Sequence, residues 1–186
     1  MNIEDLREQI KVATNNNNVV FLKDAFPVVP DWGTIIDLVD YVGSDDYVTS
    51  NTREHNIGFH RDMYIRASDV VDPNTGRSAK NISPELDTVL DFFNEVFEHD
   101  STYSEAYINL KTRVAESSPH NDGWVAVAWG CIGSIEWRIY PNFYPKQDKE
   151  DYLTYVTNPG DVIIIPRGVF HMVTPLSPRA SISLAY

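Results

Sequence analysis

Two tripeptides of the pattern His-x-Asp could each place an imidazole beside a carboxylate. One runs from His60 to Asp62 and the other from His120 to Asp122. The second opens a run typical of a β-strand, residues 120–130, in which side chains at positions i and i+2 face the same side. We therefore expect His120 and Asp122 to converge. His60 and Asp62 are expected to be exposed or to line the mouth of a site, and not to bind metal.

A third residue, His171, could complete a metal site from a distant strand. It follows residues 158–168, NPGDVIIIPRG, which predict a turn, a buried strand and a second turn. Two imidazoles and one carboxylate on one face of an octahedral ion leave three positions open, which suits non-haem Fe(II) acting on O2. The alternatives are ordinary ones: His120 and Asp122 could cap a turn, and His171 could be a hydrogen-bonded core histidine.

The alternation of side chains along the predicted strands indicates where a pocket would lie. The face that His120 shares would carry Trp124, Ala126 and Ala128, and the opposite face Val125, Val127 and Trp129. On the last strand one face would carry Arg179, Ser181, Ser183 and Ala185. We expect the small faces to line a pocket and the bulky faces to pack against a helix predicted at residues 84–99.

Arg179 would then point into the interior of the fold. A guanidinium is costly to bury unless an anion meets it, and a carboxylate is its natural bidentate partner. Asp122 is the one acidic residue on the predicted inner faces, and it is already assigned to the metal. The sequence therefore implies a dicarboxylate cosubstrate, unless Arg179 forms a salt bridge at the surface. Tyr107 and Asn109, alternate residues of an earlier strand, either reach the same pocket or point to solvent.

The elements that must position these residues divide the chain in two. Residues 1–103 form a helical and irregular prefix, with helices expected at 3–13, 32–42 and 84–99, a strand at 19–22 and a weak strand near 58–65. From residue 104 the apolar period becomes two, with strands at 106–114, 120–130, 134–140, 152–157, 161–166, 169–174 and 179–186, and turns such as 131–133 between them. We expect one domain, mainly β with flanking helices, in which a barrel or sandwich of residues 104–186 carries the helices on one sheet.

Composition makes nucleic acid and membranes disfavoured partners. The 15 Lys and Arg against 27 Asp and Glu give a net charge of −12 at pH 7, which disfavours nucleic acid. No apolar run is long enough to span a bilayer, so no membrane partner is expected. The first residues lack the apolar region of a signal peptide, and the lone Cys131 excludes an internal disulfide framework. These features predict a cytoplasmic protein, and none of them bears on its oligomeric state.

The motifs around the three candidate ligands also resemble a known family. The stretch HNDGWVAVAWGCIGSIEWRIYP, which begins at His120, and PGDVIIIPRGVFH, which ends at His171, resemble the cupin-like and JmjC-type branch of the 2-oxoglutarate- and Fe(II)-dependent oxygenases. The ending from His171 to Ser181 is similar to the Arg-x-Ser ending of prolyl-hydroxylase-like members. The likeness covers about residues 104–186.

The resemblance implies a fold, a cofactor and a reaction. The fold would be a double-stranded β-helix, the jelly-roll barrel of cupins, with Fe(II) held by His120, Asp122 and His171. The reaction would use 2-oxoglutarate and O2 to hydroxylate, or oxidatively demethylate, a peptide side chain, an amino acid or a small metabolite, with release of succinate and CO2.

The resemblance also suggests how the far carboxylate of 2-oxoglutarate is held. Arg179, helped by Ser181, corresponds to the anchor of the prolyl-hydroxylase-like branch. JmjC-type members often carry a basic residue two positions after the glycine equivalent to Gly133, and this chain has Ile135 there. Lys111 is therefore the alternative anchor. Weaker candidates for binding the cosubstrate are Ser117 and Asn109.

Two other classes of protein stay open at this point. A metal-dependent cupin enzyme, such as an isomerase or a thiol-type dioxygenase, needs no cosubstrate and hence no buried Arg179. A non-catalytic cupin-like binding module would keep the pattern without binding metal. The role of Arg179 and the metal content separate these classes from a 2-oxoglutarate-dependent dioxygenase.

Overall fold

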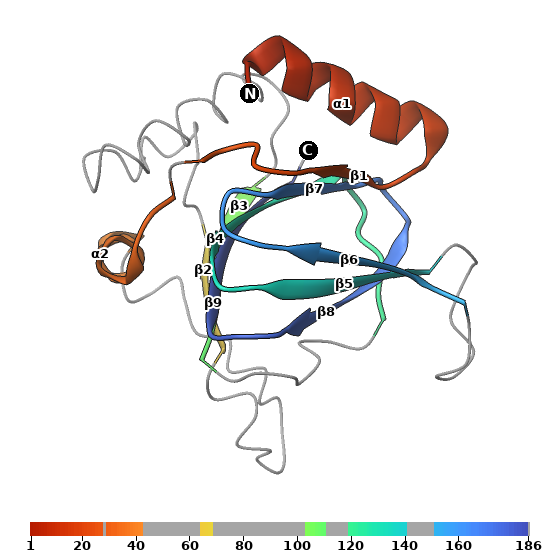
Figure 1. Ribbon diagram of the computed structural model, residues 1–186. Coiled ribbons are helices and arrows are strands. Elements are labelled where there is room, and N and C mark those ends of the chain that lie inside the picture. Colours follow the sequence, from red (N-terminus) through yellow and green to blue (C-terminus); the bar gives the residue numbers. More distant parts are fainter. Residues whose placement is uncertain (28, 43–63, 69–102, 111–118, 141–150, 186) are drawn as a thin grey trace.

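The computed structural model describes residues 1–27, 29–42, 64–68, 103–110, 119–140 and 151–185 (Figure 1). These ranges hold the helices α1 (Ile3–Asn16) and α2 (Trp32–Val42). They also hold the strands β1 (Val20–Leu22), β2 (Tyr64–Ser68), β3 (Tyr103–Asn109), β4 (Ala126–Ile132), β5 (Ile135–Tyr140), β6 (Leu153–Thr157), β7 (Val162–Ile165), β8 (Phe170–Pro175) and β9 (Arg179–Ala185). Neither described helix is both long and apolar enough to cross a membrane.

The strands form two antiparallel sheets that face each other (Figure 1). The larger sheet has the order β1-β7-β4-β9-β3-β2, and the smaller has the order β6-β5-β8. From β4 onward the chain passes repeatedly from one sheet to the other, so that strands close in sequence contribute to opposite walls. The expectation of a mainly β fold with antiparallel strands is confirmed, and β1 and β2 from the first half of the chain join the larger sheet.

Helix α1 covers the outer face of the larger sheet, where Figure 1 shows it above β1 and β7. Its N-cap is Asn2, whose side chain accepts a hydrogen bond from the backbone of Asp5 (2.8 Å). Leu6 and Ile10 lie one turn apart on its buried face. The helix continues three residues beyond the predicted range of 3–13 and ends where Asn17 adopts a left-handed conformation (φ 51°). The predicted helix at 32–42 is confirmed as α2.

The predicted alternation of faces on β4 and β9 is confirmed. The outer cluster, which includes residues of α1 and α2, contains Val125, Val127, Trp129, Ile182 and Leu184. The inner cluster, between the sheets, contains Ala126 and Ala128 together with Ile135, Trp137, Ile139 and Val173 of the smaller sheet. The helix expected at 84–99 lies outside the described residues. In the described part of the chain, α1 and α2 supply the helical cover.

Several strand boundaries differ from the predicted ones. The strand predicted at 120–130 begins only at Ala126, and β4 continues to Ile132, into the turn predicted at 131–133. Residues 121–125 do not form a strand, and within them the backbone carbonyl of Asp122 accepts a hydrogen bond from the turn residue Gly168 (2.9 Å). Of the weak strand expected near 58–65, the structure describes only the end, which belongs to β2 (Tyr64–Ser68). The strand predicted at 106–114 is β3, which begins earlier, at Tyr103. The remaining parts of both predictions lie outside the described residues.

Candidate metal centre

Two backbone hydrogen bonds hold His120 beside His171. The N–H of His120 donates to the carbonyl of His171 (3.0 Å), and the N–H of His171 donates to the carbonyl of His120 (2.7 Å). This isolated antiparallel bridge lies at the start of β8, and the centroids of the two imidazole rings are 4.4 Å apart. The two histidines therefore meet through backbone pairing, although they are distant in sequence.

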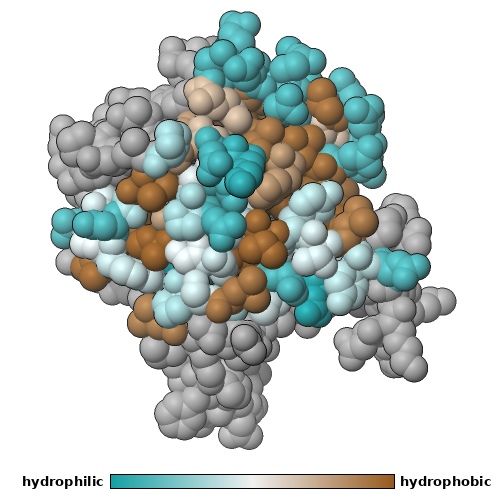
Figure 2. All heavy atoms as spheres, viewed as in Figure 1, coloured by the Kyte–Doolittle hydropathy of each residue, from teal (hydrophilic) through white to brown (hydrophobic). Residues whose placement is uncertain are grey.

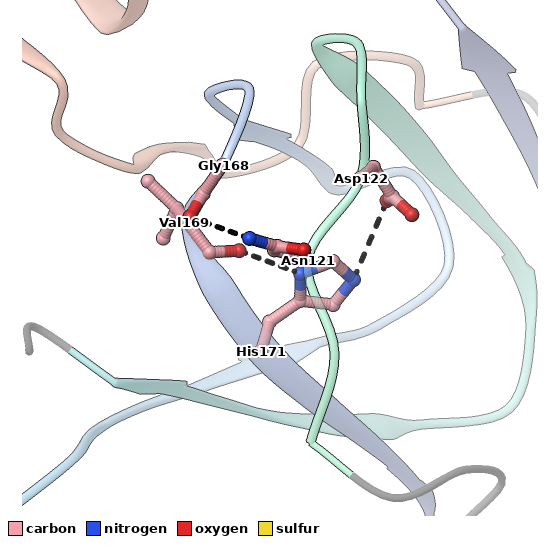
Figure 3. A network of polar contacts seen from close by, with 5 residues as sticks. All are labelled: Asn121, Asp122, Gly168, Val169 and His171. Atoms are coloured by element: carbon pink, nitrogen blue, oxygen red, sulfur yellow. Dashed lines mark hydrogen bonds and ion pairs between the residues drawn. The ribbon is translucent and has the colours of Figure 1, made fainter. Parts of the chain in front are cut away.

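Asp122 is held in place by the turn that precedes β8. Its carbonyl accepts the N–H of Gly168, and the side-chain amide of Asn121 donates to the carbonyl of Gly168 (3.4 Å, Figure 3). Gly168 has a φ of +80°, which glycine adopts without the strain that a Cβ would cause. The sequence suggested that the i, i+2 spacing of a strand brings Asp122 beside His120, but residues 121–125 do not form a strand and Asp122 is held by its hydrogen bond to the turn at Gly168.

The three side chains are close enough to share one ion. Their candidate ligand atoms all lie within 4.8 Å of one another, and Nε2 of His171 is 3.7 Å from Oδ2 of Asp122. This distance is too long for a hydrogen bond. Two ligands that are each about 2.1 Å from an ion are at most ~4.2 Å apart, so one ion can bind both atoms. His171 is buried, and His120 and Asp122 are half-buried.

The protonation of His171 also suits a metal ligand. Its Nδ1 lies 3.1 Å from the carbonyl oxygen of Val169, which can only accept a hydrogen bond, so Nδ1 carries the proton and the Nε2 lone pair faces Asp122 (Figure 3). Burial lowers the pKa of His171, and the neighbouring His120 lowers it further, whereas the bond to Val169 and the charge of Asp122 oppose the shift. A neutral imidazole is the form that binds a metal, so the donor set fits a divalent cation.

Arg179 lies in the interior, as the alternation of faces predicted. It is 1% exposed, so the alternative of a surface salt bridge is wrong. Its Nε donates to Oδ1 of Asn109 (2.7 Å), and its Nη1 donates to the hydroxyl of Ser181 and to the carbonyl of Tyr107 (3.5 Å). The guanidinium carbon lies 5.7 Å from the centre of the Tyr107 ring. These three hydrogen bonds hold the guanidinium in one orientation.

The structure groups most of the predicted site residues into two sets. His120, Asp122 and His171 form the first, and Arg179, Ser181 and Asn109 form the second. Four other residues discussed above lie outside the described part of the chain, and they are Lys111, Ser117, His60 and Asp62.

Sequence reasoning missed the groups that orient the metal ligands. Val169 and Gly168 act through backbone atoms, whose roles leave little mark on residue type. The signal that could have found them is the Pro-Arg-Gly turn directly before the histidine strand. Trp137 was also missed as a neighbour of the site; its ring centroid lies 6.3 Å from that of His171, and its indole N–H donates to the hydroxyl of Thr157 (2.9 Å).

Comparison with known proteins gives a likeness in structure alone. No protein-family model matches the chain, and no curated protein sequence matches it. Among solved structures, YcfD, a ribosomal oxygenase from Escherichia coli, matches with a TM-score of 0.60 and 15% identity, over 90% of this chain and 47% of that one. The same oxygenase matches in complex with cobalt and 2-oxoglutarate (TM-score 0.56, 15% identity) and with cobalt and succinic acid (0.56, 14%), each over 90% of this chain and 47% of that one.

The chain therefore spans about half the length of these oxygenase structures. At this level of identity the likeness establishes a shared fold. The molecule is a mainly β protein with that fold, and it carries a cluster of two histidines and one aspartate that can hold a metal ion.

Proposed function

We propose that this protein is a non-haem Fe(II)- and 2-oxoglutarate-dependent dioxygenase with a double-stranded β-helix core. The observation that carries this proposal is the convergence of His120, Asp122 and His171, whose ligand atoms lie within 4.8 Å of one another. Such a set fills three positions of an octahedral ion and leaves three for other ligands. The fold shared with the YcfD oxygenase, whose structures include cobalt with 2-oxoglutarate or succinic acid, supports the same class.

In this function His120, Asp122 and His171 hold the iron. When bound, Fe(II) supplies the activation of O2 that is coupled to decarboxylation of 2-oxoglutarate, with succinate and CO2 as coproducts. The carbonyl of Val169 keeps the proton of His171 on Nδ1, so that Nε2 is available to the metal. The backbone of Gly168 keeps Asp122 on the same side as the two imidazoles.

Arg179 is the proposed anchor for the far carboxylate of 2-oxoglutarate. Asn109 and Ser181 hold the guanidinium in a fixed orientation, and the Ser181 hydroxyl can itself donate to the cosubstrate. A buried arginine that hydrogen bonds hold in one orientation presents a planar fork that suits a carboxylate. Lys111 is the alternative anchor, and Ser117 is a further candidate.

The substrate class follows from the same proposal. Hydroxylation or oxidative demethylation would act on a peptide side chain, an amino acid or a small metabolite. Because the structurally similar YcfD is a ribosomal oxygenase, a side chain within a larger macromolecule belongs to this range. We further propose that residues 1–186 act as one domain in the cytoplasm. A cupin enzyme without 2-oxoglutarate has no use for a buried Arg179, so its burial favours the dioxygenase.

The direct test is spectroscopic. Fe(II) and 2-oxoglutarate, added without oxygen, should produce the visible charge-transfer band of the chelate, and Asp122→Ala should abolish it. Arg179→Ala should bind iron but require much more 2-oxoglutarate, whereas Arg138→Ala, which alters an arginine paired with Glu136 on β5, should leave the titration unchanged. Absence of the band in the native protein would overturn the proposed function. A normal band in Arg179→Ala and its loss in Lys111→Ala would move the anchor to Lys111.

A further inference from the structure

A cavity of about 430 Å³ shares a wall with the candidate metal centre. Its lining residues are Asn17, Asn18, Val19, Ile139, Tyr140, Leu153, Tyr155, Gly168, Val169 and Phe170. Gly168 and Val169 are the two residues whose backbone atoms bind Asp122 and His171. The turn before β8 therefore separates the cavity from the metal ligands and contacts both.

The lining of this cavity carries no formal charge on any described residue, although charged residues make up 23% of the chain. An ionised group that entered it would lose hydration without meeting a countercharge on any of these described lining residues. Three of the lining side chains are aromatic, and they offer flat apolar surfaces to a ring. The amides of Asn17 and Asn18, both exposed residues, offer hydrogen-bond donors and acceptors at the end of α1.

Size and position suit a ligand group of about one residue. Binding pockets of small ligands are commonly ~300–1,000 Å³, so this cavity is near the small end of that range. Leu153, at the start of β6, is 56% exposed and marks the solvent side, whereas Ile139 is buried and marks the inner end. Figure 2 shows hydrophobic atoms at the surface between the hydrophilic outer side of α1 and the strands below it.

We propose that this cavity binds an uncharged aromatic side chain of the substrate, with the neighbouring peptide group hydrogen-bonded to Asn17 or Asn18. The identity of the ligand as the substrate rests on the proposed function. The preference for a neutral aromatic group rests on the residues that line the cavity. A ring that contacts Val169 and Gly168 would shift the turn that orients His171 and Asp122. Binding in the cavity therefore changes the coordination of the metal.

The first test uses small probes on the metal-free protein. N-acetyl-L-phenylalaninamide should bind, as monitored by NMR shifts of the residues that line the cavity, and N-acetyl-L-argininamide and N-acetyl-L-glutamic acid amide should bind at least ten-fold more weakly. Leu153→Asp should weaken binding of the neutral probe at least ten-fold. Val156→Asp is the matched control, because Val156 is a second exposed apolar residue of β6 (39%) and does not line the cavity.

The second test measures whether binding in the cavity changes the coordination of the metal. In the Co(II)-substituted protein, saturation with N-acetyl-L-phenylalaninamide should shift the visible absorption of the ion, and Leu153→Asp should raise the probe concentration needed for that shift. The inference is overturned if the neutral probe does not bind, if a charged probe binds equally well, or if Leu153→Asp and Val156→Asp behave alike. If the metal-free protein binds the neutral probe but the protein forms no chelate band when Fe(II) and 2-oxoglutarate are added, the proposed function is overturned and the cavity assignment stays intact.

Discussion

The two faces of β4 and β9 use alternate residues of the same strands for different purposes. The outer face carries Trp129 and Leu184, almost wholly buried beneath the helices. The inner face carries the small residue Ala128 and also Ser181, which accepts a hydrogen bond from the buried Arg179. Bulky apolar side chains on one face stabilise the fold, whereas small and polar side chains on the other leave room and charge for ligands. Substitutions on the two faces should therefore separate stability from binding.

The largest separation is expected at His171 on β8. His171→Phe keeps a buried ring but removes the hydrogen bond to the carbonyl of Val169, so the free energy of unfolding should fall by only about 1–2 kcal/mol. Affinity for Fe(II) or Co(II) should fall more than about a thousand-fold, or ~4 kcal/mol. Chemical denaturation and metal titration measure the two effects. Met172→Leu, on the opposite face of β8, is the control, and metal binding by His171→Phe like that of the native protein would remove His171 from the site.

The reverse effect is expected at Trp129 on the outer face. Trp129 is fully buried and packs edge-to-face on Phe26, with ring centroids 5.9 Å apart. Trp129→Ala should lower the free energy of unfolding by about 3–4 kcal/mol while metal affinity per folded molecule stays unchanged. Trp137→Ala, on β5 in the cluster between the two sheets and near His171, should lower both quantities. If Trp129→Ala does not fold, Trp129→Phe gives a smaller loss, and weakened metal binding in that variant would contradict the division into two faces.

The same division explains which parts of the fold the sequence predicts. β5 to β9 lie within one residue of their predicted ranges because apolar patterns and the turns beside them determine them locally. β7 is a continuous buried apolar run, and Gly133, Gly160 and Gly168 in the turns all have positive φ. Residues 121–125 also alternate, yet they do not form a strand, and the carbonyl of Asp122 accepts a hydrogen bond from Gly168 instead. That hydrogen bond joins distant segments, and no local pattern encodes it.

The candidate site follows the same rule. Arg179 could be placed from its residue type and from the side of the strand on which it lies, whereas His120 lies outside β4 and is positioned by its long-range pairing with His171. The carbonyl of Val169, which fixes the proton of His171, could not be placed, since every residue has a carbonyl and only the folded turn aims this one. The direction of a side chain can therefore be predicted from the alternation of residues along a strand. The backbone hydrogen bonds made at turns cannot be predicted in this way.

A smaller effect is expected at Arg179, where the inner face meets the proposed cosubstrate. Lysine keeps the charge but loses the planar fork that binds Asn109 and Ser181 together. Arg179→Lys should weaken 2-oxoglutarate binding about ten- to hundred-fold, or ~1.4–2.8 kcal/mol, with metal affinity unchanged. Titration of the chelate band measures this change, and Arg138→Lys is the matched control on the solvent side of β5. Equal 2-oxoglutarate affinity in native protein and Arg179→Lys would argue that charge alone suffices.

The smallest effect tests a buried polar residue that belongs to neither face. Asp161 is 2% exposed at the turn before β7, where Oδ1 accepts the N–H of Asp24 (2.9 Å) and Oδ2 accepts the N–H of Asn158 (2.8 Å). Asparagine can accept only one of these hydrogen bonds, and its NH2 group would face the other N–H. Asp161→Asn should therefore lower the free energy of unfolding by about 1–2 kcal/mol, while the exposed Asp151→Asn should change it by less than about 0.5 kcal/mol. Metal and 2-oxoglutarate affinities should be unchanged in both variants, because Asp161 hydrogen-bonds backbone groups at this turn and contacts neither the candidate metal ligands nor Arg179 in any hydrogen bond described above. A loss of binding in Asp161→Asn would show that this turn and the site are coupled.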